Sequence, residues 1–215
     1  MRDLLYKEWR LSVNPVVWLW LMISVLLMVP DWPYFVVAAY VVFAFMIIGQ
    51  MDKANQDLAF AVALPVPKRR IVLARTMTVL AFELAMLVVC VPFAVWRYHV
   101  YTTDNAAGMN VNLAFFGLML VMYAVLNLVY LPGSYSRAYR LLWPVLGGAT
   151  IAMVVGGTLT TLVAVVPWLS VRLNDRGLGN PGWQAAVFVA GLVVYAGLTV
   201  LAYRRAAANF EKVDL

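Results

Sequence analysis

Long apolar segments separated by short polar segments make up most of the chain. The apolar segments fall at about residues 15–29, 34–51, 71–96, 111–131, 141–169 and 183–203. A helix needs roughly 20 apolar residues to cross roughly 30 Å of hydrocarbon, and every segment but the first comes close to that length. Segments of about ten alternating residues, which a membrane β-barrel requires, are absent. The pattern therefore predicts an all-α integral membrane protein with six transmembrane helices.

The composition is typical of a protein that is solvated by lipid. Apolar residues make up 65% of the 215 residues and charged residues only 12%, whereas a soluble domain exposes far more polar surface. We expect one transmembrane domain over residues 1–215 and no second, soluble domain. Basic residues before the first apolar segment are also typical of a signal peptide, but residues 30–33 read Pro-Asp-Trp-Pro in place of a cleavage site. We therefore interpret the first segment as a retained span.

Basic residues are distributed very unequally between the two sides of the predicted bundle. One side carries Arg2, Lys7, Arg10, Lys53, Lys68, Arg69, Arg70, Arg137, Arg140, Arg204, Arg205 and Lys212, and the other carries Arg97, Arg172 and Arg176. Lys and Arg accumulate on the cytoplasmic side of membrane proteins, so we place both termini in the cytoplasm. Arg75, just inside the third span, is expected to extend to the cytoplasmic interface. Because topology accounts for the net charge of +6, we expect no nucleic-acid partner.

The first residues of the chain predict a short helix that lies along the membrane surface. One arc of a helical wheel carries the apolar residues Leu4, Leu5, Trp9 and Leu11, and Glu8 is the one charged residue on that arc. Residues 1–12 therefore suit an interfacial helix in the headgroup region of the bilayer. The alternative is a frayed cytoplasmic end.

Motifs for common enzyme chemistry are missing from the sequence. There is no glycine-rich phosphate-binding loop, no His-Glu-x-x-His helix and no Gly-x-Ser-x-Gly turn. The chain has a single histidine, His99, and a single cysteine, Cys90, so a metal cluster built from these residue types is excluded. We expect no catalytic residues, no metal site and no cofactor bound by this chain.

Glu83 is the one acidic residue deep inside a predicted span. An ionisable group near the bilayer centre is costly and often faces a substrate path. The alternative is a neutral carboxyl group that is hydrogen-bonded to a neighbouring helix, or to Thr76 on the same helix face. Arg75 lies roughly 12 Å away along the helix axis, too far for a direct ion pair.

Small residues form a stripe on the fifth predicted span. Gly148, Ala152, Gly156 and Thr160 recur every four residues, and such stripes let two helices approach closely. The partner helix could belong to the same chain or to a second subunit, and the sequence does not choose.

The polar loop at residues 52–70 contains a predicted short helix between the second and third spans. The helix begins near Asn55 or Asp57. It ends at Pro65 and Pro67, because proline cannot continue a helix. The apolar side chains of Leu58, Phe60 and Leu64 are available to a partner. The alternative is an ordinary loop helix on the membrane surface.

These residues resemble the first cytoplasmic loop of type-2 ABC exporter permeases, the small six-span bacterial kind. That family carries a pattern close to Leu-Pro-Val-Ser/Thr-Arg, and this chain has Leu64-Pro65-Val66-Pro67-Lys68 followed by Arg69 and Arg70. Pro67 replaces the hydroxyl residue, so a cap from that side chain is lost. The segment from Leu5 to Pro15 and the ending from Phe210 to Leu215 are also similar to the family.

The resemblance implies a permease subunit of an ATP-driven exporter in the bacterial cytoplasmic membrane. ATP and Mg²⁺ would bind to a separate ATPase subunit, and two permease subunits, identical or different, would pair. The loop helix would be the coupling helix that docks on the ATPase, through Asp57, Leu58, Phe60, Leu64, Pro65 and Pro67. The interfacial helix and the first and fifth spans would help to form the dimer. Substrates of the family include peptides, drugs, lipids and glycans.

Two other functions remain compatible with the residues alone. A secondary transporter would place ionisable groups near the midplane of several spans, and here only Glu83 qualifies. A membrane scaffold or sensor would keep the same topology without any dependence on ATP.

Overall fold

The computed structural model describes residues 2–13, 15–63, 65–136 and 142–213, and these contain helices and connecting loops but no strand. In chain order the elements are α1 (Arg2–Lys7), the π-helical η1 (Glu8–Ser12), α2 (Val16–Leu19), the 3₁₀ helix η2 (Trp20–Met28), α3 (Phe35–Ala39), α4 (Val41–Ala54), α5 (Asp57–Ala63), α6 (Lys68–Val100), α7 (Leu113–Ser134), α8 (Leu142–Val165), α9 (Pro167–Leu173) and α10 (Pro181–Glu211). The all-α prediction is confirmed for the described residues.

Five helices are long and apolar enough to cross a membrane. They are Phe35–Ala54 (α3 and α4 together), α6, α7, α8 and α10. The first predicted span is a shorter apolar helix, Val16–Met28. Its four α-helical residues and nine 3₁₀ residues extend over roughly 24 Å, because a 3₁₀ helix rises about 2.0 Å per residue. That is less than the roughly 30 Å hydrocarbon core, so six spans are not established.

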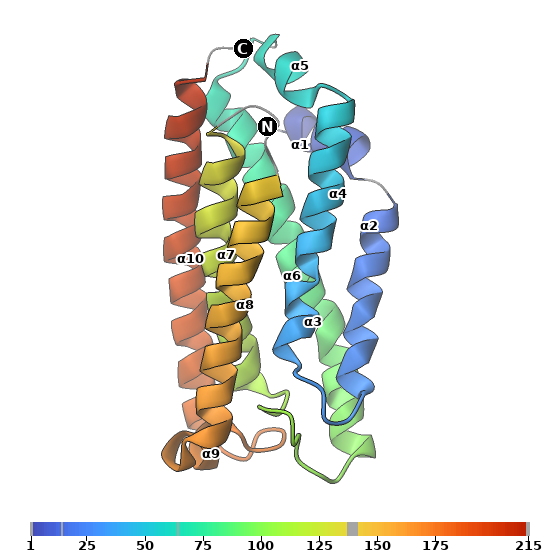
Figure 1. Cartoon of the computed structure of the whole chain (residues 1–215), viewed down its shortest axis with the longest axis vertical. Helices are drawn as coiled ribbons and strands as arrows, with labels where there is room; N and C mark the ends of the chain where they lie inside the picture. Colours follow the sequence, from blue (N-terminus) through green and yellow to red (C-terminus); the bar gives the residue numbers. More distant parts are fainter. Residues whose placement is uncertain (1, 14, 64, 137–141, 214–215) are drawn as a thin grey trace.

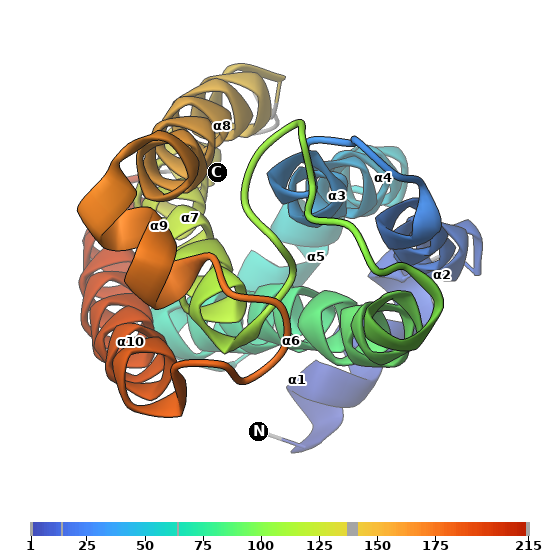
Figure 2. The same ribbon diagram turned by 90° about the horizontal axis from the view of Figure 1, so that it is seen from below.

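Both described ends of the chain lie at the same end of the bundle (Figure 1). This end also holds α1 and α5, and we call it the α5 end; α9 and the loops at the opposite end form the α9 end. Seen from the α9 end, α7, α8 and α10 gather on one side and α2, α3 and α4 on the other, with α6 contacting both groups (Figure 2).

The boundaries of the fifth and sixth spans differ from the sequence prediction. The fifth span was expected over residues 141–169, but α8 ends at Val165 and Pro167 begins the separate helix α9. Val166 is extended, as expected for a residue before proline. The sixth span was expected to end at residue 203, but α10 continues to Glu211. Its last turns remain helical because Ala206, Ala207 and Phe210 are buried there against the bundle.

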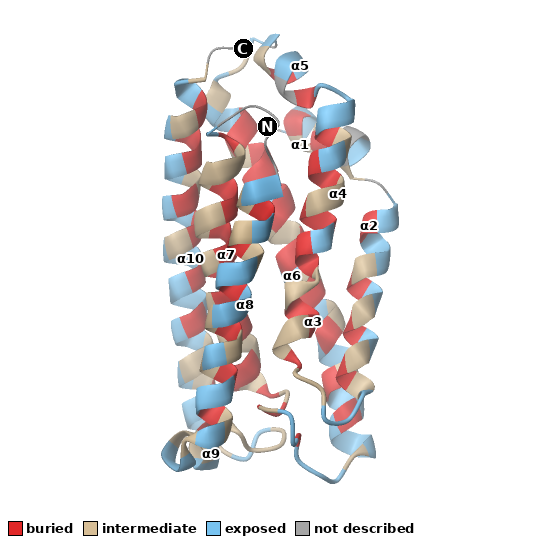
Figure 3. Ribbon diagram, in the orientation of Figure 1, coloured by how far each residue is buried: buried red, intermediate tan, exposed pale blue. Residues whose placement is uncertain are grey.

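Buried residues face the inside of the bundle, and large apolar residues face outwards along most of its length (Figure 3). Val88 on α6, Val154 on α8 and Val193 on α10 are examples of exposed apolar side chains. An apolar exterior of this extent fits contact with lipid rather than water.

The backbones of α7 and α10 approach each other closely at a pair of glycines. Gly117 on α7 faces Gly191 on α10, and a Cβ atom added at Gly191 would overlap the Gly117 carbonyl group. A Cβ added at Gly117 would lie 2.7 Å from Phe188 Cα. Only glycine fits at this crossing, which is the small-residue packing typical of membrane helices. The sequence analysis did not identify this pair, because the two glycines lie on different helices.

Candidate functional site

Five charged residues meet inside the α5 end. We call Lys7, Glu8, Asp52, Asp57 and Arg75 the charge cluster. Lys7 and Glu8 lie at the junction of α1 and η1, Asp52 on α4, Asp57 at the start of α5 and Arg75 on α6. Four of them are buried, and the Lys7 side chain is only 11% exposed. The cluster therefore joins four helical segments that are separate in the sequence.

Arg75 is the central member of the cluster. Its Nε atom lies 2.8 Å from Glu8 Oε2 and its Nη1 atom 2.5 Å from Asp52 Oδ2. Its Nη2 atom lies 3.9 Å from Asp57 Oδ2. The expected extension of Arg75 to the membrane interface was wrong, because the residue is only 7% exposed and points into the cluster. A guanidinium group carries several donors in a fixed plane and can serve several carboxylates together.

Lys7 provides the second positive charge. Its Nζ atom lies 2.7 Å from Asp57 Oδ1 and 3.6 Å from Glu8 Oε1. Burial raises the pKa of Glu8, and this is the largest effect. The positive charges of Arg75 and Lys7 lower the pKa, and the neighbouring carboxylates of Asp52 and Asp57 raise it further. The cluster thus combines two cations with three carboxyl groups at a site that is largely shielded from water. Removing one member would leave buried charges without a partner, which is much more costly than losing an exposed ion pair.

The predicted loop helix exists as α5, and its residues take different positions. Asp57 is buried in the charge cluster, whereas Phe60 is 53% exposed. Pro65 and Pro67 are exposed on the way into α6. Leu64 and the side chain of Leu58 lie outside the described residues. Asp57 therefore fastens α5 to the bundle, while Phe60 is presented to the surroundings.

A hollow of about 320 Å³ lies beside Phe60. Its walls include Asp3 and Leu4 from α1, Pro65 from the loop and Arg70 from α6. The α5 end thus presents an aromatic side chain next to a recess, with both acidic and basic groups at the edge. Such a surface can take an apolar anchor from a partner and bind charged groups around it.

Glu83 lies in a second polar group, within the apolar part of the bundle. Its Oε2 atom accepts hydrogen bonds from the Tyr195 hydroxyl group on α10 (2.7 Å) and from Asn127 Nδ2 on α7 (2.9 Å). Asn127 Nδ2 also donates to Thr199 Oγ1 at 3.3 Å. Glu83 is 0% exposed, so it contacts no open path in this conformation. The sequence left open whether Glu83 faces a substrate path or is hydrogen-bonded within the protein. In the structure it is hydrogen-bonded to two neighbouring helices.

Thr76 does not contact Glu83, because its hydroxyl group donates to the carbonyl of Val72 on its own helix. The expectation that Arg75 is too far from Glu83 for an ion pair is confirmed, since Arg75 binds the charge cluster. Sequence analysis missed Asn127 and Tyr195, although polar side chains inside apolar spans were the available signal.

The small-residue stripe on α8 packs within the chain. Gly148 lies against Leu126 and Tyr130 of α7, and a Cβ added at Gly156 would lie 2.7 Å from Met122 Sδ. Ala152 and Thr160 are buried on the same face, where Thr160 donates to the Gly156 carbonyl. The stripe therefore serves helix packing in the monomer, and the exposed side of α8 is the opposite one.

The similarity to known proteins extends over nearly the whole chain rather than over one of these sites. A protein-family model described as "ABC-2 family transporter protein" matches residues 2–209. This range includes the charge cluster, the polar group around Glu83 and the stripe on α8. No curated protein and no solved structure gives a significant match.

Proposed function

We propose that this chain, which belongs to the ABC-2 family of transporter membrane proteins, is the permease subunit of an ATP-driven exporter and works with a separate ATPase subunit. The observation that carries the proposal is the attachment of α5. One side of this short helix is tied to α1, α4 and α6 through the charge cluster, and Phe60 remains exposed for a partner. A helix held in this way transmits a push from a partner to the membrane helices.

In this proposal the α5 end faces the bacterial cytoplasm. The described basic residues at that end are Arg2, Lys7, Arg10, Lys53, Lys68, Arg69, Arg70, Arg75, Arg204, Arg205 and Lys212, and those at the α9 end are Arg97, Arg172 and Arg176. This asymmetry supports a cytoplasmic α5 end and both termini inside. The ATPase, with its ATP and Mg²⁺, would then meet α5 directly.

Phe60 is the residue on which the docking proposal is tested. We expect Phe60→Asp to reduce copurification of the ATPase and substrate export, because apolar and aromatic anchors dominate such interfaces. Asn55→Asp is the matched control, since it adds the same charge at an exposed position just before α5. The variants are compared at equal membrane expression. Full export and equal ATPase recovery in both variants would refute the coupling role of α5.

Subunit composition provides a second test. We expect the purified chain alone to show no ATP hydrolysis, and the intact complex to contain two permease and two ATPase subunits, as the family resemblance implies. The mass of the detergent-solubilised complex measures this ratio. Transport by the chain without any nucleotide-binding partner would contradict the proposal.

A further inference from the structure

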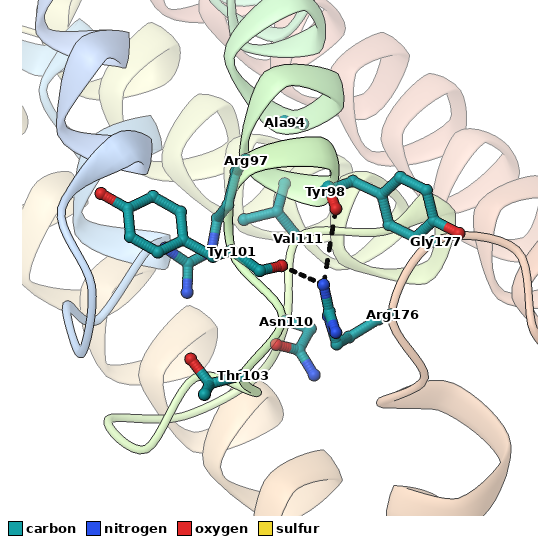
Figure 4. A pocket seen from close by; sticks show the side chains of 9 residues that line it. All are labelled: Ala94, Arg97, Tyr98, Tyr101, Thr103, Asn110, Val111, Arg176 and Gly177. Carbon is teal, nitrogen blue, oxygen red and sulfur yellow. Dashed lines mark hydrogen bonds between the residues drawn. The ribbon is translucent and has the colours of Figure 1, made fainter.

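A small polar notch lies at the α9 end (Figure 4), and a larger apolar groove lies beside it. The notch has a volume of about 20 Å³, and its polar lining consists of Arg97, Tyr101, Thr103, Asn110 and Arg176. The groove has a volume of about 460 Å³, and its apolar lining includes Val91, Val95, Leu113, Phe116 and Leu178. Ala94, Tyr98, Val111 and Gly177 line both spaces. The notch and the groove therefore adjoin each other.

Arg97 is the residue in the notch that indicates a binding site. It is only 6% exposed, and its guanidinium carbon lies 4.8 Å from the ring centre of Tyr34 and 5.0 Å from that of Tyr101. Its buried Nη1 atom has no hydrogen-bond partner among the described residues. None of the ion pairs in the described part of the chain includes Arg97. A buried cation usually has an anionic partner, and here the described residues supply none at salt-bridge distance.

Arg176, Asp104 and Asp31, at the same end, have partners other than Arg97. Arg176 donates to the backbone carbonyls of Tyr98, Tyr101 and Thr102 (Figure 4 draws the first two). Asp104 accepts a hydrogen bond from Asn110 at 3.1 Å, and Asp31 accepts one from the Ala106 amide at 3.0 Å. Asp104 and Asp31 thus accept hydrogen bonds from other groups, and neither forms an ion pair with Arg97.

The walls of the notch are held in place by asparagine side chains. Asn110 Nδ2 donates to the Asn174 carbonyl at 2.7 Å, and Asn112 Nδ2 donates to the carbonyls of Leu173 and Asp175 at 2.7 Å and 2.8 Å. These bonds join the start of α7 to the end of α9. The site is therefore formed before a ligand arrives, which lowers the entropic cost of binding.

The groove is suited to an apolar chain. Its volume is within the range of small-molecule sites in proteins. Val91 and Val95 are exposed on the outside of α6, so the groove is open to the lipid that surrounds the bundle. The notch has room for about one water-sized group. A small head group therefore fits this arrangement, and a glycan or a folded peptide does not.

We propose that the notch and the groove together bind an amphiphile with one small anionic head group. An oxygen of the carboxylate or phosphate would contact Arg97, and the acyl chain would lie in the groove between α6 and α7. This site is separate from the proposed docking of an ATPase, because the two lie at opposite ends of the bundle. Failure of one proposal therefore does not affect the other.

Binding of a labelled fatty acid to the full chain tests the site. The probes are a spin-labelled stearic acid and its methyl ester, which differ in charge and share the acyl chain. We expect the ionised acid to bind about tenfold more tightly than the ester, a ratio typical of one charge-assisted contact. Arg97→Gln should remove this preference, and Leu178→Asp should weaken the binding of both probes. Arg172→Gln, at the same end but in contact with Trp168 and Trp183, should retain the preference.

Inorganic phosphate separates a lipid site from a simple anion site. We expect phosphate alone to compete weakly with the labelled acid, because it cannot use the groove. Equal binding of acid and ester by the unmodified protein would overturn the proposal, and so would complete displacement by phosphate at low concentration. These two measurements use the unmodified chain, so they decide the question even if Arg97→Gln does not fold.

Discussion

The ammonium group of Lys7 lies 2.7 Å from Oδ1 of Asp57, and this contact joins the N-terminal helix α1 to α5. Asp57 also lies near Arg75 on α6, which in turn contacts Asp52 on α4. A displacement of α5 would therefore reach three other segments through short charged contacts. A loop attached only by its two ends would absorb much of the same displacement.

Arg75→Leu tests how much the charge cluster stabilises the fold. We expect a loss of about 3–5 kcal/mol, because three carboxyl groups would stay buried with only Lys7 as cation. Arg69→Leu is the control, since it breaks a 2.6 Å contact with Glu211 in which both side chains are exposed; water screens that pair, and the effect should be far smaller. Denaturant unfolding in detergent measures both. Equal losses would mean that burial of the cluster has little energetic consequence.

The pH dependence of stability tests Glu8. Because burial raises the pKa of Glu8 above 4.5, the folded protein keeps this proton at pH values where the unfolded chain has released it. The stability contributed by Glu8 is therefore full below its ordinary pKa and is lost as the pH rises through the raised value.

Glu8→Gln removes this titration. We expect the stability of the variant relative to the unmodified protein to increase as the pH rises from below 4.5 towards neutrality. Lys7, Asp52, Asp57 and Arg75 are present in both proteins, so the difference isolates Glu8. A relative stability that decreases over this range would show that pairing with Arg75 outweighs burial.

Gly191→Ala tests the crossing of α7 and α10. The added Cβ would overlap the Gly117 carbonyl, and such overpacking costs about 1–3 kcal/mol. Gly197→Ala is the control on the same helix, because its Cβ would have no atom within 4 Å; alanine favours helix there, so a neutral or slightly stabilising effect is expected. Thermal unfolding in detergent compares them. Equal melting temperatures would mean that the helices separate readily at Gly117.

The sequence predicted the elements of the fold better than their ends. Apolar length alone identified α6, α7 and α10, because lipid imposes the same requirement on every spanning helix. It could not show that residues 20–28 form a 3₁₀ helix packed against α6, because an apolar segment does not distinguish the two kinds of helix. It also could not separate α8 from α9 by composition, although Pro167 was a visible stop signal.

Substitutions at Glu83 test whether its carboxyl group is structural. We expect Glu83→Gln to fold and to keep most transport, because the glutamine oxygen can accept the same bonds from Tyr195 and Asn127. Glu83→Lys should impair assembly, since it removes the acceptor and places a cation in the apolar interior, at a cost of about 2.5–3.5 kcal/mol. Export and complex recovery are measured together. Loss of export by Glu83→Gln in an intact complex would indicate a functional carboxylate.

The site could be predicted only in part for a similar reason. Asp57, Phe60 and the two prolines were recognisable because they form one continuous segment. The partners of Asp57 lie on α1 and α6, and no local pattern connects Lys7 or Arg75 with α5. Glu8 gave a hint, since it interrupts an otherwise apolar helix face, but only the three-dimensional arrangement shows that Arg75 is its partner.

The charge cluster also has a consequence for the order in which the protein is made. A ribosome delivers Lys7 and Glu8 before Asp52, Asp57 and Arg75 have been synthesised. Until α6 is inserted, Glu8 has neither its guanidinium partner nor the enclosure that keeps water away from it. Helix α1 therefore reaches its final position only after α6 has been inserted, and a nascent chain that is arrested before α6 should still leave α1 in contact with water.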